Sequence, residues 1–274
     1  MPPVHSDRLI ACGMYAFTEP LRKAWSTLLA PLGEIIKQID PETKLDPLQI
    51  SFDADDNMVR SSRLLIAHTC GYPYMTLWKP THQAICVPEF DIPGCNGSQY
   101  SSWFVCRSDD QRDSIEAFAG TIAAINGPNS NSGMNVLRYQ VSQHAKSKRF
   151  FSDVLTTGGH LNSIHCVANG EADIAAIDAV SYHHILRSDP SLAHSTKVMG
   201  QSVHTTGLPF IVHRDEKIPS AVIYRALNHC VEISRHNVLD SIGLVRFNKA
   251  SESDYEPILR LEKDAAAAGY PEVR

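Results

Sequence analysis

Short apolar runs alternate along this chain with longer segments whose apolar residues recur at helical spacing. Residues 8–14, for example, are predicted to form a strand, and residues 19–39 are predicted to form the helix that follows it. Such alternation is typical of α/β folds with largely parallel sheets. The pattern therefore predicts an α/β chain in which helices flank the sheets.

Two series of this kind, joined by extended segments, predict two lobes. Lobe I takes residues 1–99 and 207–274, and lobe II takes residues 100–206. Each lobe is expected to contain a mixed, mostly parallel sheet flanked by helices. The two crossings, near residues 97–103 and 203–209, are expected to form a two-segment hinge.

Charge and composition exclude several classes of protein. The net charge of -5 weighs against a nucleic-acid binder, because such a protein needs a basic face to replace the counterions of the phosphate backbone. With 43% hydrophobic and 20% charged residues, the composition is that of a globular protein and not of a disordered chain. No run of about 18 or more apolar residues occurs, so no membrane span is expected.

The first residues, MPPVHSDRLIACGMYAF, lack a basic start followed by an apolar region. No secretory signal peptide is therefore expected in this sequence. Two interpretations stay open: the protein remains in the cytoplasm, or a leader has been removed.

The sequence predicts neither a metal nor a cofactor. Its seven cysteines are scattered, and no CxxC pair suggests a metal site or a redox motif. The histidines show no spacing typical of a known metal-ligand motif. A nucleophile elbow, a Walker loop, an HExxH motif and a Rossmann glycine pattern are also missing, so a binding protein is expected and not an enzyme.

The stretch NGPNSNSG at 126–133 lies between a predicted strand and a predicted helix. A loop of small polar residues there exposes backbone N–H groups at a helix N-terminus, which together with the helix dipole favour an anion. Ser130, Asn131 and Ser132 would add side-chain donors, and Gly133 would let the ligand come close. The competing interpretation is an ordinary turn in which Ser132 caps the helix.

The stretch TTGGHLNS at 156–163 repeats this arrangement one βα unit later. The two loops are expected at the same edge of the sheet, outside the carboxyl ends of the strands, where open α/β sheets bind ligands. His160 would donate a hydrogen bond to an oxyanion there. Its competing interpretation is a solvent-exposed residue at the start of a helix.

Four further residues complete the predicted ligand site. Asp178 ends a strand at the same edge and would orient an amine or hydroxyl of the ligand, or else cap the next helix. Tyr100, in the first crossing, would line the cleft or pack as an ordinary strand residue. Tyr15 and Gly71 lie in the corresponding edge loops of lobe I.

Several segments in a fixed order carry a family resemblance: QYSSWFV at 99–105, NGPNSNSG at 126–133, TGGH at 157–160 and VANGEADIAAID at 167–178. Together they resemble the phosphonate/phosphate/phosphite substrate-binding proteins of ABC transporters, which have the type 2 periplasmic-binding fold. The resemblance covers roughly residues 8–235 and is strongest from 99 to 178.

The resemblance implies a protein whose two lobes close over a small anionic ligand. Residues 130–132 match the loop that cradles the phosphonate oxygens, and His160 matches the histidine beside it. Tyr100 matches an aromatic residue of the crossing, and Asp178 falls near positions that contact the rest of the ligand. The family further implies an ABC permease as partner, a monomeric state and a periplasmic location.

The chain departs from the family pattern in lobe I. Where an aromatic residue is frequent after the second strand, residues 53–57 read DADDN. Carboxylates near the ligand would repel a bare phosphate and tolerate a ligand that carries an amino group.

Two alternative functions stay open. One is an enzyme on the same fold that resembles thiamine-pyrimidine synthase, although the cysteine-rich iron-binding motif of that family is missing here. The other is a cytoplasmic sensor domain whose closure signals to a partner. A Cys–His nucleophilic pair receives little support, because His160 and Cys166 lie six residues apart on one predicted helix and so face different sides.

Overall fold

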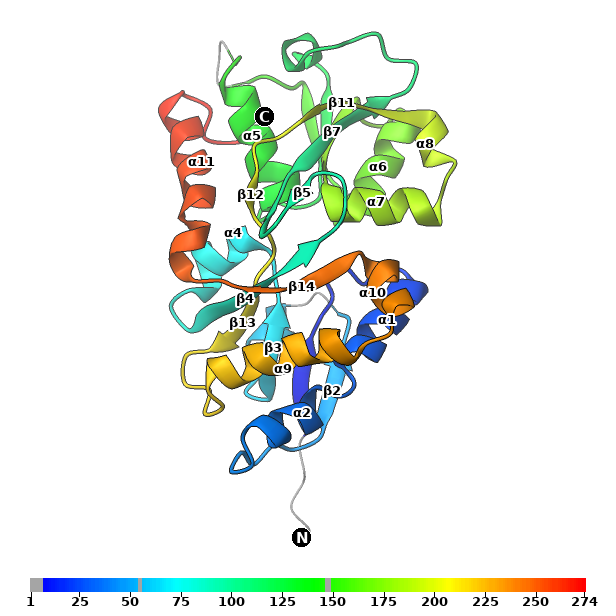
Figure 1. The fold of residues 1–274 in the computed structure, drawn as a ribbon. Coiled ribbons are helices and arrows are strands. Elements are labelled where there is room, and N and C mark those ends of the chain that lie inside the picture. The colour runs from blue at the N-terminus through cyan, green and yellow to red at the C-terminus, as the bar shows by residue number, and fades with distance from the viewer. Residues whose placement is uncertain (1–6, 54–55, 146–148) are drawn as a thin grey trace. The chain divides into compact units, whose positions relative to one another are not determined.

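The chain forms two compact α/β units in a computed structural model, which describes residues 7–53, 56–145 and 149–274 (Figure 1). Within these residues, no helix combines the length and the apolarity that crossing a bilayer requires. No group of three His, Cys, Asp or Glu side chains in the described part of the chain is arranged to hold a metal ion.

The two units are each built from separate parts of the chain. The first combines the residues up to Asp91 with Gly207–Asp254, and the second combines Ile92–Thr206 with Tyr255–Arg274. The backbone therefore passes between the units after Asp91, after Thr206 and after Asp254.

The last segment differs from the sequence-based expectation, which placed residues 207–274 together in lobe I. Tyr255–Arg274 belongs to the second unit because its helix packs on the helix that follows the 126–133 loop. The short stretch before Tyr100 also groups with the second unit, since its two small strands pair with each other there.

The first unit is built on a six-stranded sheet with the order β14-β4-β13-β3-β1-β2. Strand β1 pairs in parallel with β2 and β3, whereas β13 and β14 run antiparallel to their neighbours. The sheet is therefore mixed, with a parallel half and an antiparallel half. Its strands are β1 (Arg8–Ala11), β2 (Leu48–Ser51), β3 (Leu64–His68), β4 (His82–Phe90), β13 (Phe210–His213) and β14 (Leu244–Lys249).

The predicted helix over residues 19–39 is in fact two helices, α1 (Glu19–Leu29) and α2 (Leu32–Ile39). Pro31 stands between them, and a proline inside a helix removes a backbone hydrogen bond and clashes with the preceding turn. Both helices keep the predicted apolar face, which buries Trp25 and Ile36 completely. The remaining helices of this unit are α3 (Asp56–Val59), α4 (Gly71–Pro73), η1 (Tyr74–Trp78), α9 (Ser220–Ile233), α10 (His236–Ile242) and η4 (Glu252–Tyr255), whose last residue belongs to the second unit.

Strand β14 is held in place by a residue of the preceding helix α9. Asn228 of α9 fixes this strand, because its side chain donates to the carbonyl of Phe247 and accepts from the amide of the same residue, both at 3.0 Å. Leu244 and Phe247 are buried in the strand. Residues on another element thus decide the conformation, which local sequence pattern does not reveal.

The second unit contains a five-stranded sheet with the order β11-β7-β10-β8-β9 and a three-stranded sheet with the order β12-β6-β5. Strands β10, β8 and β9 are parallel, whereas β7 runs antiparallel to both of its neighbours. The strands are β5 (Cys95–Asn96), β6 (Gln99–Tyr100), β7 (Ser102–Arg107), β8 (Ile122–Ile125), β9 (Asp153–Thr156), β10 (Ile174–Asp178), β11 (Thr196–Gln201) and β12 (Thr205–Thr206).

Helices follow each parallel strand of the second unit, as the βα pattern predicts. The π-helical turn η3 (Asn131–Asn135) continues directly into α5 (Val136–Ser142), and the C-terminal α11 (Glu256–Ala267) lies beside it (Figure 1). The other helices are η2 (Ile115–Phe118), α6 (His160–Ala168), α7 (Ala179–Ser188) and α8 (Leu192–Ser195).

Candidate anion-binding site

Two polar loops of the second unit meet at one edge of its sheet. The segment 126–133, called the anion loop below, follows β8, and the segment 157–160 follows β9. Because β8 and β9 are parallel neighbours, their carboxyl ends lie at the same edge. The sequence predicted this juxtaposition, and the structure places side chains of the two loops in direct contact.

Ser130 forms the N-cap of the helix that begins at Asn131. Its hydroxyl oxygen accepts a hydrogen bond from the backbone amide of Gly133 at 3.0 Å. The sequence interpretation assigned the cap to Ser132, so the cap lies two residues earlier than expected. Ser132 is therefore the second residue of the helix, and its hydroxyl has no capping role.

Ser132 contacts His160, the first residue of α6. The hydroxyl oxygen of Ser132 lies 2.9 Å from Nε2 of His160, and the amide nitrogen of Asn126 lies 3.4 Å from the same ring nitrogen. The two serine hydroxyls of the loop are 3.5 Å apart. Ser130, Ser132, His160 and Asn126 thus form one continuous polar cluster at the start of two helices.

The His160 ring is neutral at pH 7. Burial among protein atoms lowers the pKa of His160 to about 4, because the charged form is poorly solvated there. Its Nδ1 atom and the side-chain oxygen of Asn126 are buried without a hydrogen-bond partner among the described residues. Buried polar atoms are rarely left unpaired, and these two lie within one polar cluster.

Gly133 is required by the side chain of Asn126. A Cβ atom at position 133 would lie 2.0 Å from the Asn126 side-chain oxygen, well inside contact distance. The side chain of Asn126 thus occupies the space beside Gly133. The sequence had predicted that the missing side chain of this glycine would let the ligand come close. The glycine acts by letting Asn126 approach His160.

Asn131 turns away from the role of ligand donor that the sequence assigned to it. Its side-chain nitrogen donates to the hydroxyl of Tyr100 at 3.1 Å and to the hydroxyl of Thr205 at 2.9 Å. Its side-chain oxygen accepts from Asn135 at 3.0 Å, and the residue is 0% exposed. An amide nitrogen has two hydrogens, and both are used by these protein partners.

Sequence reasoning missed Asn135, Arg138 and Thr205. Asn131, Asn135 and Arg138 recur at intervals of four and three, which places them on one face of the helix. Such a polar face is usually solvated, yet Asn135 is 0% and Arg138 5% exposed here. The spacing was the available signal, and only the packing of α11 against α5 shows that the face is buried.

The remaining predicted site residues have structural contacts of their own. The carboxylate of Asp178 accepts from the backbone amide of Ser181 at 2.9 Å and caps α7, which was its competing interpretation. In the first unit, Tyr15 is 3% exposed and packs edge-on against His68, and Gly71 begins α4. Roles of Asp178, Tyr15 and Gly71 in ligand binding stay predictions; of the acidic run 53–57, residues 54 and 55 lie outside the described residues.

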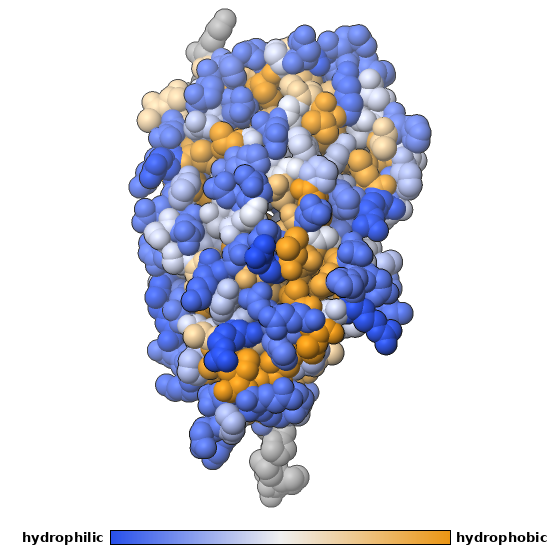
Figure 2. Space-filling model, viewed as in Figure 1, coloured by the Kyte–Doolittle hydropathy of each residue, from blue (hydrophilic) through white to orange (hydrophobic). Residues whose placement is uncertain are grey.

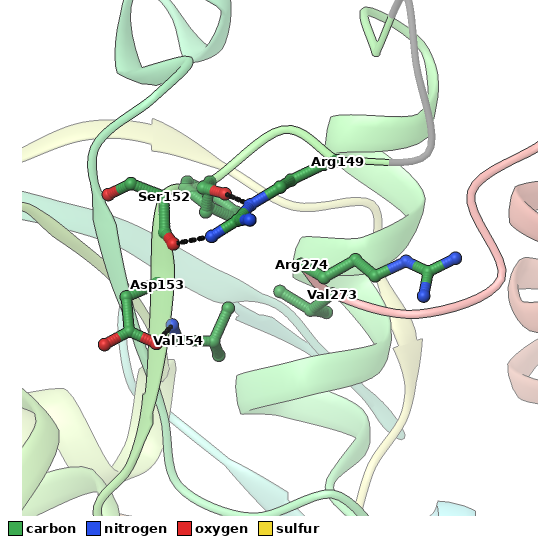
Figure 3. A pocket seen from close by; sticks show the side chains of 7 residues that line it. Arg149, Ser152, Asp153, Val154, Val273 and Arg274 are labelled. Carbon is green, nitrogen blue, oxygen red and sulfur yellow. Dashed lines mark hydrogen bonds between the residues drawn. The ribbon is translucent and has the colours of Figure 1, made fainter.

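Other hollows lie away from the anion loop. A cavity of about 390 Å³ is lined by Arg149, Ser152 and Arg274, at the amino end of β9 (Figure 3). His160 follows the opposite end of that strand. Figure 3 shows the guanidinium of Arg149 turned toward Ser152, where it donates to the backbone carbonyl, so this cation is already engaged.

In the first unit, a groove of about 800 Å³ runs along α2, α9 and β14. Figure 2 shows apolar residues gathered on the face that carries α9 and β14, and Val245 in this groove is 39% exposed. A hollow of about 420 Å³ in the second unit is lined mainly by apolar side chains, among them Trp103 and Leu186. Neither hollow has the converging hydroxyl and backbone donors of the anion loop.

The fold is shared with solved binding proteins. The binding-protein component of an ABC phosphonate transporter from Pseudomonas aeruginosa matches with a TM-score of 0.74 and 17% identity, covering 96% of this chain and 88% of that chain. PhnD1 from Prochlorococcus marinus, solved in complex with methylphosphonate, matches with a TM-score of 0.73 and 14% identity, covering 96% and 99%. The aliphatic sulphonate binding protein SsuA from Escherichia coli matches with a TM-score of 0.60 and 12% identity, covering 95% and 85%.

These likenesses establish the type 2 periplasmic-binding fold that the sequence predicted. No curated protein sequence matches the chain significantly. The family model described as "ABC transporter, phosphonate, periplasmic substrate-binding protein" matches residues 22–255, which is most of the chain. The protein therefore belongs to the phosphonate-binding family of ABC-transporter substrate-binding proteins.

Proposed function

We propose that the anion loop binds the oxyanion group of a phosphonate, phosphate or phosphite-like ligand. The contact between Ser132 and His160 carries this proposal, because it brings a hydroxyl and an imidazole together at two adjacent helix N-termini. First-turn N–H groups of a helix have no intrahelical acceptor and point toward such a ligand. Methylphosphonate, the ligand of the structurally similar PhnD1, is the natural probe.

The site binds an anion with dipoles and not with a formal positive charge. His160 is neutral at pH 7, and the buried Arg138 is engaged by Asn135, Pro271 and Glu262. Helix dipoles and hydroxyl groups stabilise an anion without the desolvation cost of a buried cation. Such a site releases its ligand more readily than an ion pair would, which suits a protein that hands its ligand to a transporter.

Capture without catalysis is part of the proposal. Burial raises the pKa of the Cys166 thiol, and its hydrogen bond to Glu171 raises it further, so this cysteine is no thiolate nucleophile at pH 7. We further propose that the protein acts as a monomer, that its two units close over the ligand, and that an ABC permease receives the ligand. Tyr15 and Gly71 would supply contacts from the first unit.

The test is calorimetric titration with methylphosphonate of the wild type and of the double variant Ser130→Ala/Ser132→Ala. Each lost hydrogen bond to a charged group is worth about 1.5–3 kcal/mol, so the double variant is expected to bind at least about 100-fold more weakly. Loss of the Ser130 cap costs only about 1 kcal/mol of stability. The control variant is Ser188→Ala, which removes a serine hydroxyl bonded to Ile185 near the end of α7.

Normal binding by the double variant would show that the anion loop is not the site. A wild type that ignores methylphosphonate, phosphate and phosphite but is stabilised by pyridoxal phosphate or Fe(II) would support the enzyme alternative. Both outcomes can also be read in a thermal-shift assay in which each variant is heated with each of these compounds, because a ligand that binds the native state raises the melting temperature.

A further inference from the structure

A hydrogen-bond network that begins at Asn131 of the anion loop reaches residues near all three segments by which the chain passes between its two units. We propose that Asn131 and Asn135 are positioning residues that couple ligand binding at the loop to these three connections. The inference rests on the proposed function, because it needs a ligand at the anion loop. The hydrogen-bonded residues on which it rests all belong to the second unit.

The first two connections meet at the side chain of Asn131. Tyr100 lies in β6, shortly after the chain enters the second unit, and Thr205 lies in β12, shortly before the chain leaves it. These two residues are direct partners across the antiparallel β6–β12 pair. The Asn131 amide donates to both hydroxyls, at 3.1 and 2.9 Å, so the residue next to the Ser130 cap holds the two strands together.

The third connection meets the side chain of Asn135. The chain returns to the second unit at Tyr255, and Ile258 is in the first turn of α11. The side-chain nitrogen of Asn135 donates to the backbone carbonyl of Ile258 at 2.9 Å and to the side-chain oxygen of Asn131 at 3.0 Å. Figure 1 shows α11 alongside α5. Asn135 directly precedes α5 and Ile258 is the third residue of α11, so this contact lies near the start of both helices.

The network is closed at its far end by Arg138. Its guanidinium donates to the side-chain oxygen of Asn135 at 2.6 Å and to the carbonyl of Pro271 at 3.0 Å. Hydrogen bonds in such a chain polarise one another, and each buried member depends on its neighbours. If the anion loop moves while the three connections stay in place, the buried side-chain amides of Asn131 and Asn135 lose hydrogen-bond partners. This loss is unfavourable, so the loop and the connections are expected to move together.

The physical consequence is a cooperative unit that joins the ligand loop to the hinge. The Ser132 hydroxyl contacts His160 and lies 3.5 Å from the Ser130 hydroxyl, whereas the side chain of the intervening Asn131 donates to Thr205. A ligand that pulls on the two serines therefore acts on Asn131 through the same turn of backbone.

Hydrogen exchange read by mass spectrometry, with and without methylphosphonate, tests the coupling. In the wild type we expect the ligand to slow exchange in the anion loop and in segments 91–96, 203–210 and 250–258. Thr205→Val removes one acceptor with little change of shape and is expected to abolish the response in 203–210. Asn135→Leu is expected to abolish the response in 250–258.

The matched control is Thr196→Val, which removes a buried hydroxyl bonded to Leu192 in the same unit but outside the network. It is expected to keep the wild-type response in every segment. Thr205→Val leaves one hydrogen of the Asn131 amide unpaired with and without ligand, so it should lower the melting temperature, and the exchange response of segment 203–210 carries the test. Circular dichroism establishes that each variant is folded; if Asn135→Leu does not fold, Thr205→Val carries the test.

The outcomes separate this inference from the proposed function. Without a binding heat and without protection of the anion loop in the wild type, the proposed function fails and the coupling with it. If the loop is protected but the three connections do not respond, or if Thr205→Val responds like Thr196→Val, the coupling alone is overturned. The coupling is supported if Thr205→Val loses the ligand-induced protection only in 203–210 and Asn135→Leu loses it only in 250–258.

Discussion

The hydroxyl oxygen of Ser132 lies 2.9 Å from Nε2 of His160, although the two residues belong to different helices. A serine hydroxyl has one hydrogen, so it donates either to the imidazole or to a bound oxyanion. If that hydrogen turned to a ligand, the hydroxyl oxygen could accept a hydrogen bond from Nε2 only in the neutral tautomer that carries its proton on Nε2 and none on Nδ1.

His160→Ala is expected to weaken methylphosphonate binding by about tenfold or more, because a donor to the oxyanion is lost. The melting temperature should also fall, because Ser132 and Asn126 lose their contacts with Nε2 of the ring, so binding is measured at a temperature at which the variant is folded. Calorimetry and thermal unfolding measure the two effects. His165→Ala on the same helix is the control and should bind as the wild type does; equal binding by both variants would exclude His160 from the site.

Gly133→Ala is expected to displace Asn126, because the new Cβ would lie 2.0 Å from its side-chain oxygen. The displaced amide loses its 3.4 Å contact with His160, and ligand affinity should fall with it. Gly127→Ala is the matched control in the same loop, since a Cβ there meets nothing within 4 Å. Titration of both variants with methylphosphonate checks the difference, and indistinguishable affinities would contradict it.

His68→Phe is expected to make the protein less sensitive to mild acid. Burial lowers the pKa of His68 to about 3, and its ring stacks on Phe210 at 4.5 Å. The unfolded chain, with a histidine pKa near 6.5, binds the extra proton between about pH 3 and 6.5, so the free energy of unfolding falls as the pH drops through that range.

Removing His68 should reduce this slope by up to about 1.4 kcal/mol per pH unit. Phenylalanine keeps the stacked ring and leaves no buried nitrogen unpaired, so the variant should remain folded at pH 7. Urea unfolding at pH 5 and pH 7 gives the slope. His236→Phe, at an exposed position of α10, is the control; an unchanged slope in His68→Phe would refute the prediction.

Asp110→Asn is expected to destabilise the second unit by about 1–2 kcal/mol at pH 7. Hydrogen bonding to Arg112 lowers the pKa of Asp110 to about 2, and its side chain is 4% exposed. The stabilisation is present above the usual aspartate pKa and is lost as the pH falls toward 2.

Chemical denaturation measures this loss. Asp109→Asn is the neighbouring control, because the Asp109 side chain is 81% exposed and its pair with Arg107 is worth little. A loss at position 109 as large as that at position 110 would show that burial of the ion pair is not the cause.

Sequence pattern alone established the α/β class and the edge at which the polar loops meet. Parallel strands put their carboxyl ends on one side, so the segments 126–133 and 157–160 had to lie near each other once β8 and β9 were recognised. Local chemistry also explains the break at Pro31, although the prediction ran one helix through it. These features depend on neighbours in sequence, which is why they can be predicted.

Only the tertiary structure decided the roles of Asn131, Asn135 and Asn228. A polar side chain on a helix is compatible with ligand, solvent or protein partners, and the choice depends on which distant segment packs against it. Thr205 takes one hydrogen of Asn131, and Ile258 takes one of Asn135, although each lies far along the chain. The placement of residues 255–274 in the second unit and the strand β14 follow from such contacts, which no local pattern encodes.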